Sequence, residues 1–317
     1  MRSPEKVLNS LSEHSKVSDY KFERLYRVLF NSDMFLLAYH NIQGKQGNMT
    51  EGSDGKTIDG MSLKRIENLI GALKNESYQP KPARRTYIPK KNGKMRPLGI
   101  PSFDDKLVQE VLRMIMGAIY EGSFENTSHG FRPKRSCHTA LIQVQKNFTA
   151  AKWFIEGDIE GFFDNINHDV LIGILKERIA DDRFIRLIWK FLKAGYIEDW
   201  AFHRTYSGTP QGGIISPILA NIYLDKLDKY MKEYADKFDK GERRGMNLEY
   251  KSYSGKIWWL GTKLKQTEDR ETRKELIDAI KQHQKNRMHL PSVDEMDEGY
   301  RRIKYVRYAD DFIIGVI

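Results

Sequence analysis

Two adjacent aspartates, Asp310 and Asp311, stand between two apolar, β-favouring runs close to the end of the sequence. These runs, residues 306–309 and 312–317, predict a strand–turn–strand unit with both carboxylates at its tip. Like charges held in an apolar setting repel each other and lose hydration, and a divalent cation relieves both costs. A solvated turn is the simpler explanation of a bare Asp-Asp pair, so the metal interpretation requires a further ligand.

Asp158 is a candidate for that ligand, because it lies in another apolar run, residues 153–159, which predicts a buried strand. Magnesium takes oxygen ligands, usually a few carboxylates together with substrate phosphates. Phosphoryl transfer by two metal ions needs the ions about 3.5–4 Å apart. Strands that are distant in sequence can be neighbours in a sheet, so Asp158 and the Asp310-Asp311 pair can supply one such platform.

The charge balance favours a polyanionic partner. The chain of 317 residues carries 53 Lys and Arg against 43 Asp and Glu, which gives a net charge of +10 and a pI near 9.3. Basic side chains gain affinity for phosphates through counterion release. A soluble basic protein without a nucleic-acid partner is the plain alternative, so the charge indicates a class of partner and no reaction.

Other features of composition restrict the compartment. A single cysteine, Cys137, excludes an intrachain disulfide and fits a reducing environment. No run approaches the roughly 18 apolar residues of a membrane span, and mean hydropathy is −0.61. Charged residues stand near the N-terminus where a secretory signal would be apolar. We therefore expect a cytoplasmic protein without membrane contact.

The order of helix and strand patterns predicts an α+β fold. Residues 44–60 have loop composition, and residues 230–298 look like a charged insertion that is helical between 268 and 284. Apolar residues at helical spacing predict a helix over residues 20–42, with a new cap at 31–33. The same spacing predicts further helices over residues 62–73, 104–120, 168–179, 182–193, and 216–224 and beyond. Strand patterns cover a hairpin at 84–100 with an Asn92-Gly93 turn, the run 153–159, and residues 303–317.

Five blocks, in order, resemble reverse transcriptases. The metal-binding hairpin of that family resembles YADD (residues 308–311), and its first aspartate block resembles GDIEGFFDNI (157–166). Its nucleotide-pocket block is similar to SGTPQGGIISPILANIYLDKLD (207–228). Its fingers blocks are similar to RRTYIPKKNGKMRPLGIPSFDDK (84–106) and SHGFRPKRSCHTAL (128–141). With TEGSDGKTIDG (50–60), these blocks resemble the group II intron-encoded reverse transcriptase and maturase branch.

This resemblance implies the fingers and palm of a right-hand polymerase, with an antiparallel palm sheet packed on helices. It implies a helical, RNA-binding N-terminal extension at 1–80, fingers at 81–152, palm with part of the fingers at 153–229, a charged insertion at 230–300 and the catalytic hairpin of the palm at 301–317. The family continues into a thumb and a maturase domain. We therefore expect a chain truncated before the thumb that is weakly active or inactive alone.

The same resemblance implies the site residues. The catalytic aspartates are Asp158, Asp310 and Asp311. The ligands of two Mg²⁺ ions, for which Mn²⁺ can substitute, are Asp158, Ile159, Asp310 and Asp311. The nucleotide contacts are Arg85, Lys90, Arg96, Phe163 and Gln211. The template contacts are Arg132, Lys134 and Arg135, in a basic loop that also carries His129 and Phe131.

Each assignment has a plainer alternative. A bulky ring at Phe163 would exclude a 2′-hydroxyl, but Phe162 and Phe163 could both be core, and we expect one of them to be. The glycine-rich segment around Gln211 could be an ordinary connector. Lysines such as Lys91 and Lys94 could simply keep an edge strand solvated. We expect Cys137 and His168 to be structural, since neither has zinc ligands at suitable spacing.

The implied function is RNA-directed DNA synthesis for a group II intron, copying intron RNA during retrohoming, with a maturase role in splicing. The implied partners are group II intron RNA, an RNA template with a DNA primer, and deoxynucleoside triphosphates; a homodimer stays open. One alternative is an RNA-binding splicing cofactor with a vestigial polymerase site. Another is a reverse transcriptase of a different bacterial retroelement.

Overall fold

The computed structural model describes residues 2–45, 47–89, 93–209 and 212–317. These residues divide into two compact units. The first unit comprises residues 1–146, 156–230 and 306–313, and the second comprises 147–155, 231–305 and 314–317. The predicted division into functional regions at 80, 152, 229 and 300 stays a prediction.

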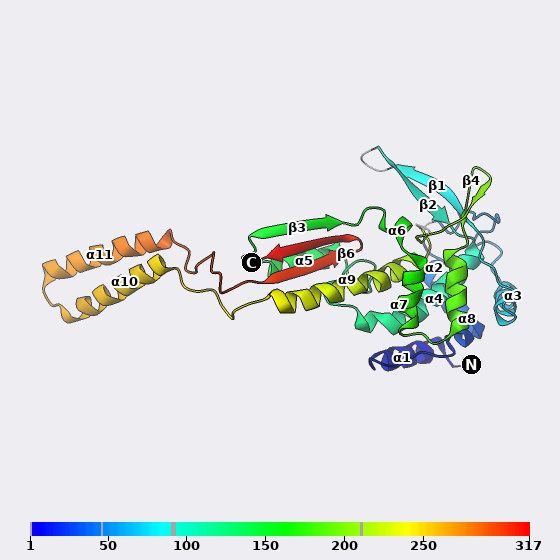
Figure 1. The fold of residues 1–317 in the computed structure, drawn as a ribbon, viewed down its shortest axis with the longest axis horizontal. Helices are drawn as coiled ribbons and strands as arrows, with labels where there is room; N and C mark the ends of the chain where they lie inside the picture. Colours follow the sequence, from blue (N-terminus) through cyan, green and yellow to red (C-terminus); the bar gives the residue numbers. More distant parts are fainter. Residues whose placement is uncertain (1, 46, 90–92, 210–211) are drawn as a thin grey trace. The chain divides into compact units, whose positions relative to one another are not determined.

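Helices make up most of the first unit, and Figure 1 labels the α-helices along the chain; the last residues of α9 belong to the second unit. Their bounds are α1 (Pro4–Ser15), η1 (Leu25–Phe30), α2 (Ser32–Ile42), α3 (Leu63–Lys74), α4 (Phe103–Tyr120), η2 (Glu121–Ser123), α5 (Cys137–Asn147), α6 (Phe162–Asn165), α7 (His168–Lys176), α8 (Asp182–Leu192) and α9 (Ser216–Phe238). The predicted helix over residues 20–30 is wrong in type, because only a 3₁₀ segment from Leu25 forms there. The predicted cap at residues 31–33 is confirmed, since Asn31 accepts a hydrogen bond from the Asp33 backbone.

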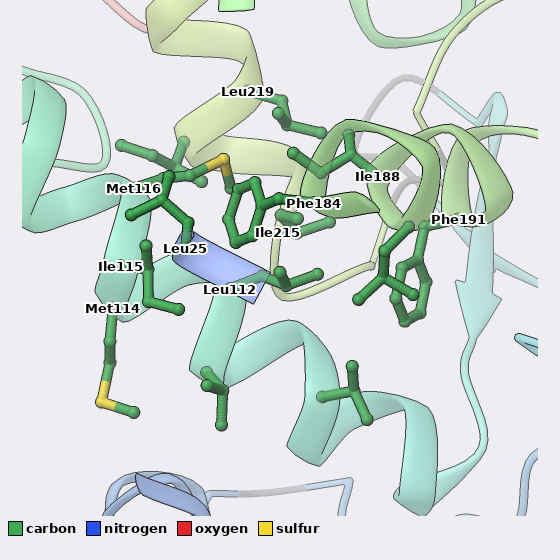
Figure 2. Packing of buried hydrophobic residues seen from close by; sticks show 14 of the residues in the cluster. Leu25, Leu112, Met114, Ile115, Met116, Phe184, Ile188, Phe191, Ile215 and Leu219 are labelled. Carbon is green, nitrogen blue, oxygen red and sulfur yellow. The ribbon is translucent and has the colours of Figure 1, made fainter. Parts of the chain in front are cut away.

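The core of the first unit is built around α4, which is buried on nearly all sides. Its neighbour α8 is strongly amphipathic, and Asp181 caps it by accepting from the backbone N–H of Phe184. Figure 2 shows Leu112 of α4, Phe184 and Ile188 of α8, and Leu219 of α9 gathered in this core. The core therefore fixes the helices from which the site loops extend.

A four-stranded sheet in the order β2-β1-β4-β5 contains the predicted basic hairpin. Its strands are β1 (Ala83–Pro89), β2 (Met95–Ile100), β4 (Tyr196–Glu198) and β5 (Ala201–His203). The pair β1–β2 is antiparallel, with Tyr87 opposite Pro97, and β2 is an edge strand, where proline is tolerated. The turn at Asn92 lies outside the described residues. The parallel pairing of β1 with β4 was not predicted.

A three-stranded sheet in the order β3-β7-β6 carries the aspartates. Its strands are β3 (Trp153–Asp158), β6 (Ile303–Tyr308) and β7 (Asp311–Val316). The predicted strands are confirmed, but the predicted burial of the run at 153–159 is wrong. Trp153 is 67% exposed and Ile155 is 52% exposed. The physical reason is that β3 is an edge strand, whose side chains receive less cover than those of a central strand.

In the second unit, residues 248–288 form two helices, α10 (Leu248–Gln266) and α11 (Arg270–Met288), which lie side by side (Figure 1). The insertion is thus more helical than predicted, since helix was expected only between 268 and 284. Neither helix has a buried residue. The predicted α+β class is confirmed by the two sheets and the helices. Across the residues that the structure describes, no helix is both long and apolar enough to cross a bilayer.

Candidate active site

The acidic pair lies at the turn between β6 and β7, as the sequence predicts. β6 ends at Tyr308 and β7 begins at Asp311, so only Ala309 and Asp310 connect two neighbouring strands. A connection this short joins antiparallel strands. Ala309 has a left-handed backbone, with φ at 57°. Such a conformation costs energy for a residue other than glycine, and it holds the turn in one sharp shape.

Asp158, at the end of β3, comes close to this turn. Asp158 and Asp311 line one open cavity of about 480 Å³, together with Gly157, Tyr308 and Phe312. Burial raises the pKa of the Asp311 carboxyl, and the negative charges of Asp310 and Asp158 raise it further. The three carboxylates therefore lie within electrostatic range of one another.

The donors suit magnesium, because all three side chains offer carboxylate oxygens and Ile159, the residue after Asp158, offers a backbone carbonyl. Among the described residues, no three His, Cys, Asp or Glu side chains meet at ligand distance from a single point. The fit to a cation thus rests on the donor chemistry, the shared cavity and the charge coupling at Asp311.

A second groove, of about 340 Å³, lies beside Phe163. The Phe162 ring is buried, while the Phe163 ring is half-buried and reaches this groove. The 207–209 segment is tied to α6, because Thr209 N–H donates to the Phe163 carbonyl over 2.7 Å. Gly208, with φ at 81°, lies so close to this carbonyl that a Cβ would stand 2.5 Å from its oxygen. The expectation that one of the two rings belongs to the core is confirmed, since Phe162 is a core residue.

Arg85 lines the same groove from β1. Its guanidinium stacks over the Tyr196 ring at 3.5 Å, and its Nη1 lies 3.9 Å from a Glu198 carboxylate oxygen. Arg96 is exposed on β2, opposite Ile88. The predicted contacts Lys90 and Gln211 lie outside the described residues.

The basic loop at residues 128–135 is organised differently from the prediction. Arg132 is buried, and its guanidinium donates to the Glu121 carboxylate and to the backbone carbonyls of Glu125 and Ser128. The predicted template contact does not fit this placement, because these donors are spent inside the protein. Arg135 donates to the backbone of Asn126 and Ser128. Exposed groups of this loop are Lys134 and Phe131, whose ring meets that of Phe163 edge-on at 6.2 Å.

Two residues of the site were missed by the sequence reasoning. Arg204 lines the groove beside Phe163, and β4–β5, which precedes it, is too short for a clear strand pattern. Arg307 is fully buried next to the acidic turn. The sequence did contain a sign of the role of Arg307, because a charged residue stands inside the apolar strand that leads to Asp310. Such a residue is rarely buried unless it is paired.

Comparisons with known proteins agree with this geometry. A family model described as reverse transcriptase (RNA-dependent DNA polymerase) matches residues 88–249. The group II intron-encoded protein LtrA of Lactococcus lactis subsp. cremoris is 48% identical over 312 residues, 98% of this chain and 51% of LtrA. An uncharacterized 91 kDa protein in the cob intron of Schizosaccharomyces pombe is 43% identical over 98% of this chain and 38% of its own length.

A third relative, the putative COX1/OXI3 intron 1 protein of Saccharomyces cerevisiae, is 40% identical over 92% of this chain and 34% of its own length. The chain therefore spans about half the length, or less, of these relatives. The matched segment 88–249 covers just over half of the chain and includes Asp158, Phe163 and the 207–213 loop. The chain belongs to the reverse transcriptase (RNA-dependent DNA polymerase) family.

Proposed function

We propose that this protein is the RNA-directed DNA polymerase of a group II intron, and that it also binds the intron RNA as a maturase. The observation that carries the proposal is the placement of Asp158 and Asp311 on one cavity, with Asp310 close enough to raise the pKa of Asp311. A module that only binds RNA needs no such group of carboxylates. The names of the intron-encoded relatives support the choice of a group II intron.

Asp158, Asp310 and Asp311, with the Ile159 carbonyl, would hold two Mg²⁺ ions, for which Mn²⁺ can substitute. When bound, the ions activate the primer hydroxyl and stabilise the leaving pyrophosphate. The protein's own contribution is to fix Asp158 and Asp311 at strand ends and Asp310 in the short turn between two strands. Rigid strands hold such groups more accurately than loops do.

Residues around the second groove would bind the incoming deoxynucleotide. Arg85 and Arg96 carry positive charge for the triphosphate, and Lys90 and Gln211 stay predicted contacts. The half-buried Phe163 ring would occupy the space that a 2′-hydroxyl needs. Of the predicted template contacts, the exposed Lys134 and the half-buried Arg135 stay in the proposal. The exposed Phe131 ring beside Lys134 supports them, because an aromatic ring and a cation suit a single strand.

The test is primer extension on an RNA template by the full-length protein. In the double variant Asp310→Asn/Asp311→Asn, we expect the rate of deoxynucleotide addition to fall about 1,000-fold or more, because metal ions contribute several kcal/mol and each 1.36 kcal/mol is tenfold. Binding of the intron RNA should stay nearly unchanged, because Asp→Asn substitutions remove negative charge that would repel phosphates and leave every basic side chain in place.

A charge-matched control is Asp169→Asn/Asp182→Asn, which removes two exposed carboxylates of the same unit. This control should extend primers at the wild-type rate. Loss of RNA binding together with synthesis in the first variant would indicate a folding defect. Intron binding without any synthesis by the wild-type protein would favour a splicing cofactor and contradict the proposal.

A further inference from the structure

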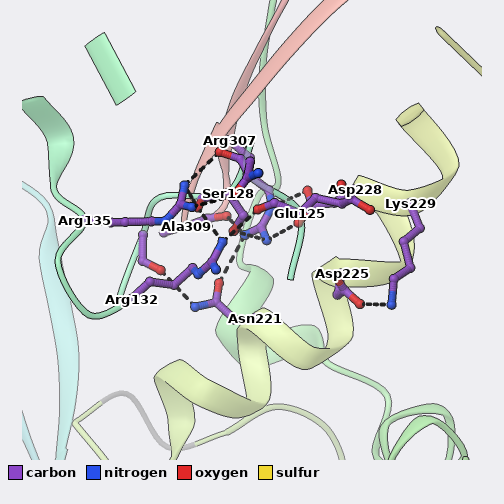
Figure 3. A network of polar contacts seen from close by, with 12 residues as sticks. Glu125, Ser128, Arg132, Arg135, Asn221, Asp225, Asp228, Lys229, Arg307 and Ala309 are labelled. Carbon is purple, nitrogen blue, oxygen red and sulfur yellow. Dashed lines mark hydrogen bonds and ion pairs between the residues drawn. The ribbon is translucent and has the colours of Figure 1, made fainter. Parts of the chain in front are cut away.

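Arg307 lies on β6 directly before the acidic turn and is completely buried. Its partner Asp228, on α9, is also fully buried, and an ion pair of 2.6 Å joins the two side chains. Figure 3 shows Arg307 at the centre of a polar network that includes Ser128, Asn221 and Ala309. A buried arginine so close to the metal-binding aspartates requires an explanation.

All five N–H groups of the Arg307 guanidinium are used. Nε and Nη2 donate to the two carboxylate oxygens of Asp228, over 2.7 and 2.6 Å. The remaining donors reach the Ser128 hydroxyl (2.8 Å), the Asn221 side-chain oxygen (3.3 Å) and the backbone carbonyl of Ala309 (2.7 Å). Arg307 thus binds the backbone of the turn itself, and Ala309 is the residue before Asp310.

The backbone of Arg307 is also fixed, by hydrogen bonds to a neighbouring segment. Arg307 N–H donates to the Thr127 carbonyl over 2.8 Å, and His129 N–H donates to the Arg307 carbonyl over 2.9 Å. Gly130 approaches Ala309 so closely that a Cβ would lie 2.3 Å from the Ala309 nitrogen. The segment from Thr127 to Gly130 therefore lies against the hairpin, on β6, an edge strand of its sheet.

Stability alone does not account for this arrangement. A buried ion pair costs desolvation that its attraction only partly repays, and well-packed apolar residues often replace such a pair without loss of stability. What apolar residues cannot replace is the directional bond to the Ala309 carbonyl. We therefore infer that the network serves to fix the shape of the acidic turn.

We propose that Arg307, held by Asp228, is a positioning residue that fixes the Ala309–Asp310 turn so that Asp310 and Asp311 face Asp158. This inference rests on the proposed polymerase function. Among the described contacts, the Arg307 guanidinium reaches the Ala309 carbonyl but none of the carboxylates of Asp158, Asp310 and Asp311, so it acts through the turn. Lysine would keep the charge but would lose the fork that joins Asp228 and Ala309.

The main test is the double variant Arg307→Met/Asp228→Leu in the full-length protein, which removes both buried charges together. We expect cooperative unfolding to be retained, while kcat for deoxynucleotide addition falls about 10- to 100-fold and the Mn²⁺ affinity weakens by a similar factor. KM for the deoxynucleotide should change less than about threefold, because the groove beside Phe163 is not altered. Mn²⁺ affinity is measured by electron paramagnetic resonance without substrate.

Two further variants keep the test decisive. Arg307→Lys is the conservative change, and it should show the same kcat and Mn²⁺ defects. It replaces the double variant in the test if the double variant does not fold. Leu73→Ala removes a fully buried side chain of α3 and serves as a control for lost stability. This control should unfold more easily but retain wild-type kcat and Mn²⁺ affinity.

The outcomes separate the two proposals. A folded double or Lys variant with wild-type kcat and Mn²⁺ affinity would overturn the positioning role, as would an equal loss of both in Leu73→Ala. If the wild-type protein adds no deoxynucleotide, the polymerase proposal fails. Mn²⁺ affinity then decides the positioning role by itself, since weaker binding in the folded variants supports it and unchanged binding refutes it.

Discussion

Arginines do different work in the two units of this chain. In the first unit, Arg307 is completely buried and uses every donor on fixed partners. In the second unit, Arg287 of α11 lies over the Tyr250 ring at 5.3 Å and donates to the Ser254 hydroxyl at 3.4 Å, in a pair of helices without a buried residue. The same side chain is part of a fixed network in one place and a loose surface contact in the other.

The difference between Arg307 and Arg287 indicates which parts of the protein hold side chains in one fixed arrangement. A buried polar network specifies one arrangement, because every unsatisfied member is costly. Exposed pairs tolerate several arrangements at little cost. The first unit holds the acidic turn within such a network. In contrast, α10 and α11 have no buried residue, and Arg287 joins them through surface contacts. Three predictions test whether this contrast is real.

The largest effect should come from breaking one half of the buried pair. Arg307→Met alone leaves the Asp228 carboxyl buried without the guanidinium that now pairs with it, which we expect to cost about 3–5 kcal/mol of unfolding free energy. The matched change Arg287→Met in α11 should cost less than about 1 kcal/mol. Urea denaturation of both variants measures the two losses. Similar values for the two would show that burial does not separate these arginines.

The next effect concerns pH and the buried carboxyl of Asp105 in α4. Burial raises its pKa from 3.8 to about 7, although the Tyr78 hydroxyl and the Lys81 N–H donate to it. Between these values the folded state holds a proton that the unfolded chain has released. Unfolding free energy should therefore fall as pH rises from about 4 to 7, by up to about 4 kcal/mol.

Asp105→Asn should remove this slope, and urea titrations between pH 4 and 8 would show it. An exposed aspartate of the second unit should behave in the opposite way. Hydrogen bonds from Thr272 lower the pKa of Asp269, so its contribution is present above the unfolded pKa and is lost as pH falls. A slope that survives in Asp105→Asn would assign the pH dependence to another group.

Local patterns made much of the fold predictable. The Ser216-Pro217 start of α9 and the Asn31 cap of α2 depend on neighbours in sequence, and both are found. The two apolar, β-favouring runs on either side of Asp310 and Asp311 were enough to predict a hairpin. Strand patterns allowed Asp158 and Asp311 to share one site, and the family resemblance selected this arrangement, in which both residues line one cavity.

Features that depend on distant partners were not predictable. Arg132 reads as a solvated cation, but it is buried because Glu121 and the turn at 125–128 accept its hydrogen bonds. The three-residue strand β4 has no clear sequence pattern, and it joins the sheet through its parallel pairing with β1, more than a hundred residues earlier. Apolar residues such as Trp153 suggested burial, yet strand position in the sheet determines exposure.

The smallest effects should come from two glycines whose surroundings differ. A Cβ on Gly130 would meet the Ala309 nitrogen at 2.3 Å and its Cα at 2.8 Å, both backbone atoms of the acidic turn. A Cβ on Gly255, in α10, would meet nothing within 4 Å. Gly130→Ala should therefore destabilise the protein by about 1–3 kcal/mol, as overpacking does. Gly255→Ala should stabilise α10 by about 0.5–1 kcal/mol, because alanine favours a helix.

Urea denaturation measures both changes, and Mn²⁺ affinity adds a second readout for Gly130→Ala. The added methyl group must push the 127–130 segment away from the turn, so metal binding should weaken along with stability. Because Arg307 and this segment hold the same turn, Gly130→Ala should add little in a protein that already carries Arg307→Lys. Fully additive losses would mean that the two contacts act on the hairpin independently, and the network would then be two separate supports.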